Sequence, residues 1–490
     1  MYKRQVCTAL VLLTALANLS HAAADDDRWY TVEMFGGRAG WMHVTQKTEG
    51  ETITSETAIQ FSLKRGAVSL DISMESRFVE TADGKPVSMR STQKFGAEPM
   101  VQDFTFKDEG VELVTTQNGQ SRTSMLAKPE GTWLTPAAAE RYVLQRFKSG
   151  AQEIVVRSVD PFTGVEPVSS TRTGFEKTTV MAMGRTIDAT KVTVEVSNFP
   201  GVKSAEFVDG EGALIRSETS MGGMKFNTIA ATKEEALADA VAPEVMVGTL
   251  VKPDRPIPNP RQATHAVYLL SVPEGPMPPI PPTGAQRIDT VDERTLRVTV
   301  LTTNPGPAGD DTSDVYLRAS GLADSEDEKI QSLTKRATAK SGEDPSKRAE
   351  DIRRFVYRYV KKKNLGVGFA SATEVAQTRE GDCTEHGVLL TAMLRANGIP
   401  ARAVTGLLYV DEFAGEANIF GYHMWAQALL TIDGQARWVD LDGTLPPATP
   451  FYATHIALAT SDLADGDMVG SVASIATLMG RLDIKVESVK

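Results

Sequence analysis

The sequence has few cysteines, no excess of positive charge and no long apolar run. Its 490 residues carry 52 Lys and Arg against 63 Asp and Glu, which gives a net charge of −11. An acidic chain repels nucleic acid and anionic lipid, so neither is expected as a partner. No apolar run reaches the roughly 20 residues that span a bilayer, so no transmembrane segment is expected. The length and the ordinary composition favour a folded chain of about two to four domains.

The N-terminus has the pattern of a signal peptide. Lys3 and Arg4 precede the apolar run Val6–Ala17, and small residues follow it. A charged start, a short apolar stretch and a small-residue cleavage site are typical of exported proteins. We therefore expect residues 1–24 to be removed and the mature chain to be periplasmic or secreted, while the cleavage position stays open.

Only two cysteines occur in the chain, Cys7 and Cys383. Removal of residues 1–24 would leave Cys383 alone. An exported protein normally pairs its cysteines or loses them, because a lone thiol is open to oxidation. Cys383 is thus either a buried, inert packing residue or a thiol retained for its chemistry.

Residues 25–242 are predicted to form a β-rich domain. Segments such as Glu51–Leu63 and Ile187–Val196 alternate or are rich in β-branched residues, and turn dipeptides such as Asp83-Gly84 separate them. One helix is predicted from Thr135 to about Lys148. We expect a large antiparallel sheet, curved around that helix.

Residues 243–324 are predicted to be a Pro-rich linker with a small β domain. Ten of the 25 prolines lie between Pro253 and Pro282, and proline removes ladder donors and stiffens the chain. From residue 325 the pattern becomes helical: Ser325-x-x-Glu328 fits a capping box, and Asp344-Pro345 fits a second helix start. The whole chain is therefore predicted to be an α+β multidomain protein with its last domain at 325–490.

A third predicted helix begins at the lone thiol. Asp382-x-x-Glu385 fits a capping pattern, so Asp382 is the predicted N-cap and Cys383 lies in the first turn. Backbone N–H groups and the helix dipole favour a thiolate there, and the same N–H groups can donate to an oxyanion.

A predicted hairpin supplies a base and a carboxylate. With its two-residue loop at Asp433-Gly434, Trp425 lies opposite Asp442, and His423 is a diagonal neighbour of Asp442, within side-chain reach at roughly 7–8 Å or less. Asp440 lies four residues along from His423, roughly 13 Å of strand rise, which is too far for a hydrogen bond. The hairpin therefore selects Asp442 as the group that orients His423.

Three blocks resemble the transglutaminase-like superfamily: Gly381–His386, His423–Trp425 and Trp438–Thr444. The resemblance covers about residues 325–465. It implies a papain-like α+β domain in which Cys383 is the nucleophile, His423 the base and Asp442 its orienting group. Gly443 stands where the family usually has proline, and Gln427 where many relatives have Glu.

The resemblance implies a cysteine peptidase or amidase, or a transglutaminase-like acyltransferase, acting on amide bonds through a thioester. Hydrolysis is the default, because excluding water from an acyl-enzyme needs a specially built tunnel. We expect a peptide or protein substrate, with the cell envelope as one source of it, and no cofactor. Two alternatives stay open: a non-catalytic binding or scaffold protein with a degenerate domain, and a lipid or peptide carrier that uses its β-rich domain.

Further residues are weaker candidates. Asp382, Trp425 and Tyr422 are candidates for substrate or oxyanion binding. His386 lies three residues from Cys383, but one thiol and one imidazole do not make a zinc site, so no metal is expected. His455, with the loop before it, is a candidate wall of the cleft.

Overall fold

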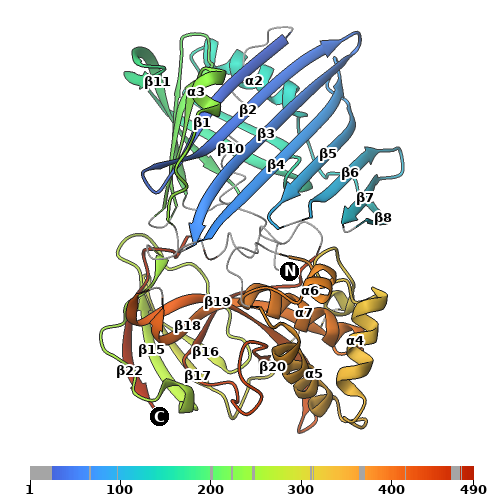
Figure 1. Ribbon diagram of the computed structural model, residues 1–490. Helices are drawn as coiled ribbons and strands as arrows, with labels where there is room; N and C mark the ends of the chain where they lie inside the picture. Colours follow the sequence, from blue (N-terminus) through green and yellow to red (C-terminus); the bar gives the residue numbers. More distant parts are fainter. Residues whose placement is uncertain are drawn as a thin grey trace. The chain divides into compact units, whose positions relative to one another are not determined.

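A computed structural model describes residues 25–490 apart from twelve residues or short segments. These are 66–67, 97, 118, 199–201, 222–223, 245–248, 310–311, 313, 363–369, 414, 465–474 and 476. The predicted signal peptide lies outside the described residues. The chain divides into two compact units, Met1–Val245 and Met246–Lys490 (Figure 1), and the α+β multidomain prediction is confirmed.

The first unit is built on one fourteen-stranded sheet in the order β8-β7-β6-β5-β4-β3-β2-β1-β14-β13-β12-β11-β10-β9. Its strands are β1 (Asp25–Met34), β2 (Gly37–Glu49), β3 (Thr52–Arg65), β4 (Val68–Thr81), β5 (Pro86–Lys94), β6 (Met100–Phe106), β7 (Val111–Gln117), β8 (Gln120–Leu126), β9 (Glu153–Asp160), β10 (Gly164–Ala182), β11 (Arg185–Val196), β12 (Lys203–Val208), β13 (Leu214–Met221) and β14 (Met224–Ala231). All pairs are antiparallel, and β1 pairs with β14 to join the two halves.

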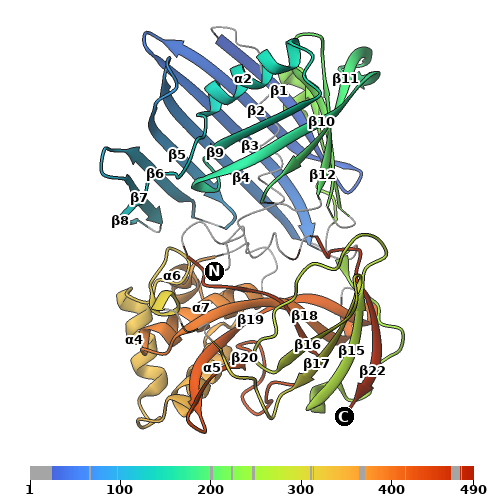
Figure 2. The same cartoon turned by 180° about the vertical axis from the view of Figure 1, so that it is seen from behind.

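Two helices belong to this unit, α2 (Pro136–Lys148) and α3 (Lys233–Leu237). Helix α2 lies on one face of the sheet, where β9 and β10 also cross over β3 and β4 (Figure 2). Gln46 of β2 donates to the buried Glu140 of α2 at 2.8 Å. The buried Glu80 of β4 accepts from Ala137 N and Thr135 Oγ1, so a carboxylate from the sheet satisfies the start of α2. The predicted sheet curved around a helix is therefore found.

The second unit contains two four-stranded sheets, β16-β17-β15-β22 and β20-β19-β18-β21. Their strands are β15 (His265–Ser271), β16 (Gln286–Asp292), β17 (Thr295–Leu301), β18 (Ala401–Phe413), β19 (Glu416–Ile432), β20 (Gln435–Leu441), β21 (His455–Ser461) and β22 (Asp483–Val489). One hydrophobic cluster joins the sheets, with Tyr268 and Val298 packed among Leu407, Phe420 and Ile456.

Helices cover the β18–β19 region of this unit. They are α4 (Glu328–Thr338), α5 (Pro345–Tyr359), α6 (Ala372–Thr378) and α7 (Cys383–Ala396), with 3-10 turns η3 (Pro260–Gln262) and η4 (Asp314–Leu317). Helix α7 packs on β18 and β19, and α4, α5 and α6 surround it (Figure 1). Its residues from Glu385 to Arg395 are all buried, so α7 is the central helix and its first turn is fixed in place.

Two details differ from the sequence expectations. Helix α4 begins at Glu328 with Asp327 as N-cap, because the Asp327 carboxylate accepts from the N–H groups of Lys329 and Ile330. The expected capping box at Ser325 is wrong. The segment 243–324, expected to form a small domain, lies largely in the second unit, because β15 pairs with the C-terminal strand β22.

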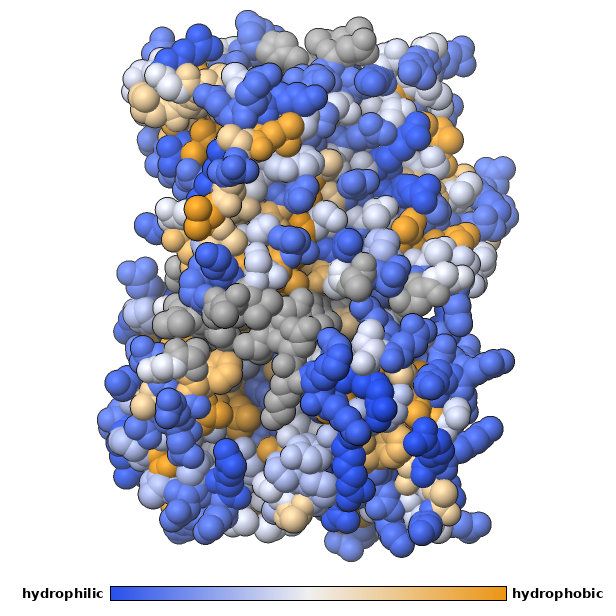
Figure 3. All heavy atoms as spheres, in the orientation of Figure 1, coloured by the Kyte–Doolittle hydropathy of each residue, from blue (hydrophilic) through white to orange (hydrophobic). Residues whose placement is uncertain are grey.

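The surface seen in Figure 3 is mostly hydrophilic on each unit, with apolar residues in small scattered groups. The large exposed apolar side chains of the described residues include Met125, Met181 and Val241. Scattered apolar residues are usual on soluble surfaces. Among the described residues, no helix is long and apolar enough to cross a membrane.

Candidate active site

Helix α7 presents Cys383 as its first residue. Asp382 is the N-cap and forms a capping box with Glu385: Thr384 N donates to Asp382 Oδ1 at 2.9 Å, and Asp382 N donates to Glu385 Oε2 at 2.8 Å. The predicted cap is confirmed. Burial and then the Asp382 charge raise the pKa of Glu385. The thiol is partly exposed although the helix behind it is buried, so it is held rigidly and remains accessible.

Gly381 explains how the chain enters this turn. Its φ is +147°, and a Cβ at this position would lie 2.3 Å from the Glu385 Cβ. Only glycine fits this backbone conformation and this close approach. The Gly-Asp-Cys order therefore has a steric basis.

His423 lies on β19 beside the carboxylate. Its Nε2 donates to Asp442 Oδ2 at 2.8 Å. The neighbouring Cys383 thiol helps, after Asp442, to raise the pKa of this imidazole. Because Nε2 is used by Asp442, Nδ1 is the nitrogen left for the thiol.

Electrostatics favour the charged forms of His423 and Asp442. Burial alone would lower the pKa of His423, but the charge and hydrogen bond of Asp442, together with Cys383, raise it to about 10. Burial opposes ionisation of Asp442 as well, yet His423 and His455 hold its pKa well below the usual range. A thiolate beside an imidazolium is the reactive state of a cysteine nucleophile.

Asp442 comes immediately after β20 and not within the paired part of the hairpin. The loop is at Asp433-Gly434 with Ile432 paired to Gln435, as predicted, but the ladder ends at Ala426 paired to Leu441. The Asp442 side chain instead bonds to the turn that follows it. Its Oδ1 accepts from both Thr444 N and Thr444 Oγ1, each at 2.7 Å. This turn closes although Gly443 stands where a proline is usual.

Asp440 has different partners from Asp442. It accepts from Trp425 Nε1 at 2.8 Å, from Gln427 Nε2 at 2.7 Å and from Ala285 N at 2.8 Å. Burial raises its pKa, opposed by these hydrogen bonds. No contact joins Asp440 to His423 among the described residues, so the choice of Asp442 over Asp440 agrees with the geometry.

The weaker candidates lie at the margins of the site. Trp425 is buried and its ring lies 6.1 Å from that of His423, but its N–H is used by Asp440. The Tyr422 hydroxyl is buried without a hydrogen-bond partner in the described part of the chain, and burial raises its pKa. His386 Nδ1 lies 2.5 Å from the Asp382 carbonyl oxygen, a bond within the first turn of α7. Binding roles for Asp382, Trp425 and Tyr422 stay predictions.

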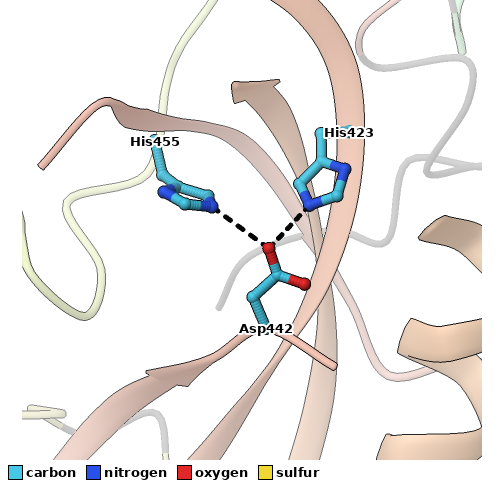
Figure 4. A group of neighbouring side chains, drawn as sticks. All are labelled: His423, Asp442 and His455. Atoms are coloured by element: carbon cyan, nitrogen blue, oxygen red, sulfur yellow. Dashed lines mark hydrogen bonds and ion pairs between the residues drawn. The ribbon is translucent and has the colours of Figure 1, made fainter. Parts of the chain in front are cut away.

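Two residues near Asp442 were underestimated or missed. Arg353 of α5 is buried and donates to the carbonyl oxygens of Asp442 and Leu445 at 3.3 and 2.9 Å. The signal for it in the sequence was a charged residue next to the apolar stripe of α5. His455 begins β21 and places Nε2 3.2 Å from Asp442 Oδ2 (Figure 4). It is a direct neighbour of the carboxylate, and its role as a wall of the cleft stays a prediction.

His423, Asp442 and His455 also have the composition of a metal site, since one ligand atom of each lies within 4.8 Å of the others. Their orientation suits hydrogen bonding better. Both Nε2 atoms point at the same carboxylate oxygen at 2.8 and 3.2 Å (Figure 4). The other carboxylate oxygen accepts from Thr444. The expectation of no metal stays a prediction.

A partly exposed cysteine at a helix N-terminus, with an imidazole nearby that is bonded to a buried carboxylate, is the arrangement that cysteine hydrolases and acyltransferases use. Residues 331–443 match the model of the transglutaminase-like superfamily. This part of the chain is a transglutaminase-like domain, and the resemblance predicted from three sequence blocks is confirmed.

Solved structures give weaker likenesses. A β-barrel-like protein of a domain of unknown function from Brucella abortus is 12% identical, with a TM-score of 0.33 over 43% of this chain and 97% of that chain. A candidate cysteine protease from Cytophaga hutchinsonii is 18% identical, with a TM-score of 0.27 over 45% and 82%. A candidate protease from Parabacteroides distasonis is 11% identical, with a TM-score of 0.18 over 56% and 63%. No curated protein matches the chain.

Proposed function

We propose that this chain is an exported thiol-dependent hydrolase that cleaves amide bonds in peptides or proteins, with Cys383, His423 and Asp442 as its catalytic triad. One observation carries the proposal: His423 is hydrogen-bonded to Asp442 at 2.8 Å, and its pKa is raised by Asp442 and also by the neighbouring, partly exposed Cys383. The transglutaminase-like domain supports the same chemistry.

In the first half of the proposed reaction, the Cys383 thiolate attacks the carbonyl carbon of the amide. The C–N bond then breaks as the His423 imidazolium gives its Nδ1 proton to the leaving amine. The product is a thioester between the substrate acyl group and Sγ. Asp442 stays ionised throughout and holds the His423 ring through Nε2, which stabilises the imidazolium before the proton leaves.

The oxyanion formed during attack needs donors. The first-turn N–H groups of α7 point toward the helix N-terminus and lie beside the thiol, so we propose the Cys383 N–H as one donor. The backbone N–H of Asp382 donates to Glu385, and its carboxylate accepts from Thr384 N. Its role in this proposal is to fix the turn that carries the nucleophile.

In the second half, a nucleophile attacks the thioester and His423 takes its proton. Water gives hydrolysis, and a primary amine gives transamidation. We favour water, because retaining an acyl group for an amine requires a site that excludes water. Export is supported by the charged and apolar N-terminal pattern of residues 1–24. Export in turn favours a cell-envelope peptide or protein as the substrate, in the periplasm or outside the cell.

The proposal is tested by acylation with p-nitrophenyl acetate, a small activated ester that needs little substrate specificity. Mass spectrometry should find an acetyl group on Cys383, sensitive to hydroxylamine as a thioester is. Cys383→Ser tests the nucleophile, and His423→Ala tests the base. Acetylation confined to surface lysines, with Cys383 unmodified in the folded protein, would overturn the proposal and favour a non-catalytic binding protein. Decay of the thioester with and without added amine distinguishes hydrolysis from acyl transfer.

A further inference from the structure

Asp442 accepts hydrogen bonds from two imidazoles. His423 Nε2 and His455 Nε2 both point at its Oδ2 atom, at 2.8 and 3.2 Å (Figure 4). His423 comes from β19 and His455 from the start of β21, so separate strands meet at one carboxylate oxygen. The proposed reaction uses only the first of these histidines.

The surroundings of His455 fix its protonation. Its Nε2 faces the Asp442 carboxylate, and its Nδ1 lies 2.9 Å from the carbonyl oxygen of Tyr452. Both partners only accept hydrogen bonds, because Asp442 is held in its ionised form. A neutral imidazole has one donor nitrogen, whereas the imidazolium has two. His455 is only 2% exposed, so water cannot readily replace either partner, and the doubly protonated ring is the form that satisfies both contacts.

We propose that His455 is a resident imidazolium that positions Asp442 and sets the pH range over which Cys383 and His423 form their ion pair. This inference rests on the proposed function, since it assigns a positioning residue to the same triad. His455 acts through Asp442 and does not touch the reacting atoms. Its two effects, holding the carboxylate and adding a positive charge, can be separated by substitution.

The charge effect follows from the separation of the rings. The ring centroids of His423 and His455 are 5.8 Å apart. In this proposal, a positive charge on His455 favours the anionic form of the Cys383 thiol, because opposite charges attract. It also repels the His423 imidazolium, so that ring loses its proton at lower pH than it would beside Asp442 alone. Removing the cation should move both ionisations to higher pH.

Other titratable groups around His455 do not account for such a shift. Those that face it or feel its charge are Asp442, Asp440, His423 and Tyr452, with Arg353 on the Asp442 carbonyl oxygen. Burial raises the pKa of Tyr452 to about 12, so this phenol stays neutral across the range of interest. All these groups remain in a variant that changes His455 alone, and their contributions largely cancel in the comparison.

The test compares wild type, His455→Gln and His455→Phe by the rate of iodoacetamide alkylation of Cys383 against pH. The rate changes once where the thiol ionises and again where His423 loses its proton. In His455→Gln, which can still donate to Asp442, both steps should move up by roughly one pH unit while the plateau rate stays near wild type. His455→Phe removes the donor too, so its plateau rate should also fall.

The outcomes separate this inference from the proposed function. If wild-type Cys383 titrates as an ordinary thiol, the proposed function fails. If wild type reacts at low pH but His455→Gln has both steps unmoved, the inference fails and the proposed function stands. If neither variant folds, NMR of the ring nitrogens in wild-type protein labelled at histidine decides between the two protonation states of His455. Protonation of both His455 nitrogens at pH 7 supports the inference, and a neutral tautomer overturns it.

Discussion

Asp440 and Asp442 lie two residues apart at the end of one strand and have different hydrogen-bond partners. Asp442 accepts from His423 at 2.8 Å, whereas Asp440 accepts from Trp425 at 2.8 Å and from the backbone of Ala285 at 2.8 Å. Asp442 is buried and Asp440 is partly buried, and only Asp442 reaches the imidazole. Substitution of Asp440 therefore serves as the control for substitution of Asp442.

Asp442→Asn should reduce acyl transfer by on the order of 10² to 10⁴-fold, because an amide cannot stabilise the His423 imidazolium. Asp440→Asn should reduce it by less than about tenfold but should cost about 1 to 3 kcal/mol of stability, because its NH2 group would face a donor. Acylation rates and denaturant unfolding of both variants check this. Equal losses of activity at equal stability would contradict the assignment of Asp442.

The His423–Asp442 pair should make stability depend on pH. The pKa of His423 is raised to about 10 from an ordinary value near 6.5. Its contribution to the free energy of unfolding is therefore fully present below about pH 6.5 and is lost as pH rises through about 10. The pKa of Asp442 is lowered, so its contribution is present above about pH 4 and is lost as pH falls further.

Denaturant unfolding of wild type and His423→Gln between pH 5 and 10 measures this effect. The stability difference between the two proteins should shrink by on the order of a few kcal/mol toward pH 10. A difference that is constant across the range would mean that the raised pKa of His423 is absent. The comparison with the variant removes the contributions of all other titrating groups.

Gly284 should be required where the Pro-rich segment 243–324 packs against strands β19 and β20. Its φ is +57°, and a Cβ there would lie 2.1 Å from Asp440 Oδ2 and 2.4 Å from Gln427 Nε2. Gly284→Ala should therefore lower stability by about 2 to 4 kcal/mol, since strain adds to a steric clash. Gly434→Ala is the matched control, because its φ is +75° but nothing lies within 4 Å of the added Cβ.

The control should cost only about 1 kcal/mol, the strain of a left-handed non-glycine residue. Thermal unfolding of the two variants makes the comparison. If they are equally stable, the segment does not press against Asp440 as described, and the contact between Ala285 N and Asp440 loses its importance.

Local signals in the sequence predicted much of the site. The Asp382 cap and the two-residue loop at Asp433-Gly434 each depend on short-range chemistry, and both were predicted correctly. Asp442 is the carboxylate that bonds to His423, although the ladder assumed to carry it ends at Leu441. The Asx-type bonds of Asp442 to Thr444 replace that ladder, and a register argument does not contain them.

Local sequence patterns did not predict the long-range contacts. His455 reaches Asp442 because β21 pairs with β18 and not with β20, and strand order is not written in any local pattern. Likewise β15 pairs with β22 across more than two hundred residues of chain, so the segment 243–324 looked like a separate domain. Arg353 makes its bonds to loop carbonyls, which sequence periodicity does not reveal.

The most direct test of the proposed mechanism is the pH dependence of Cys383 alkylation by iodoacetamide in the folded protein, with His423→Ala alongside. Mass spectrometry of the Cys383 peptide keeps Cys7 out of the measurement. The mechanism predicts reaction that stays fast well below the free-thiol pKa of about 8.5, and loss of that low-pH reactivity in His423→Ala. Titration near 8.5 in both proteins, or no reaction until denaturant is added, would contradict a thiolate paired with His423.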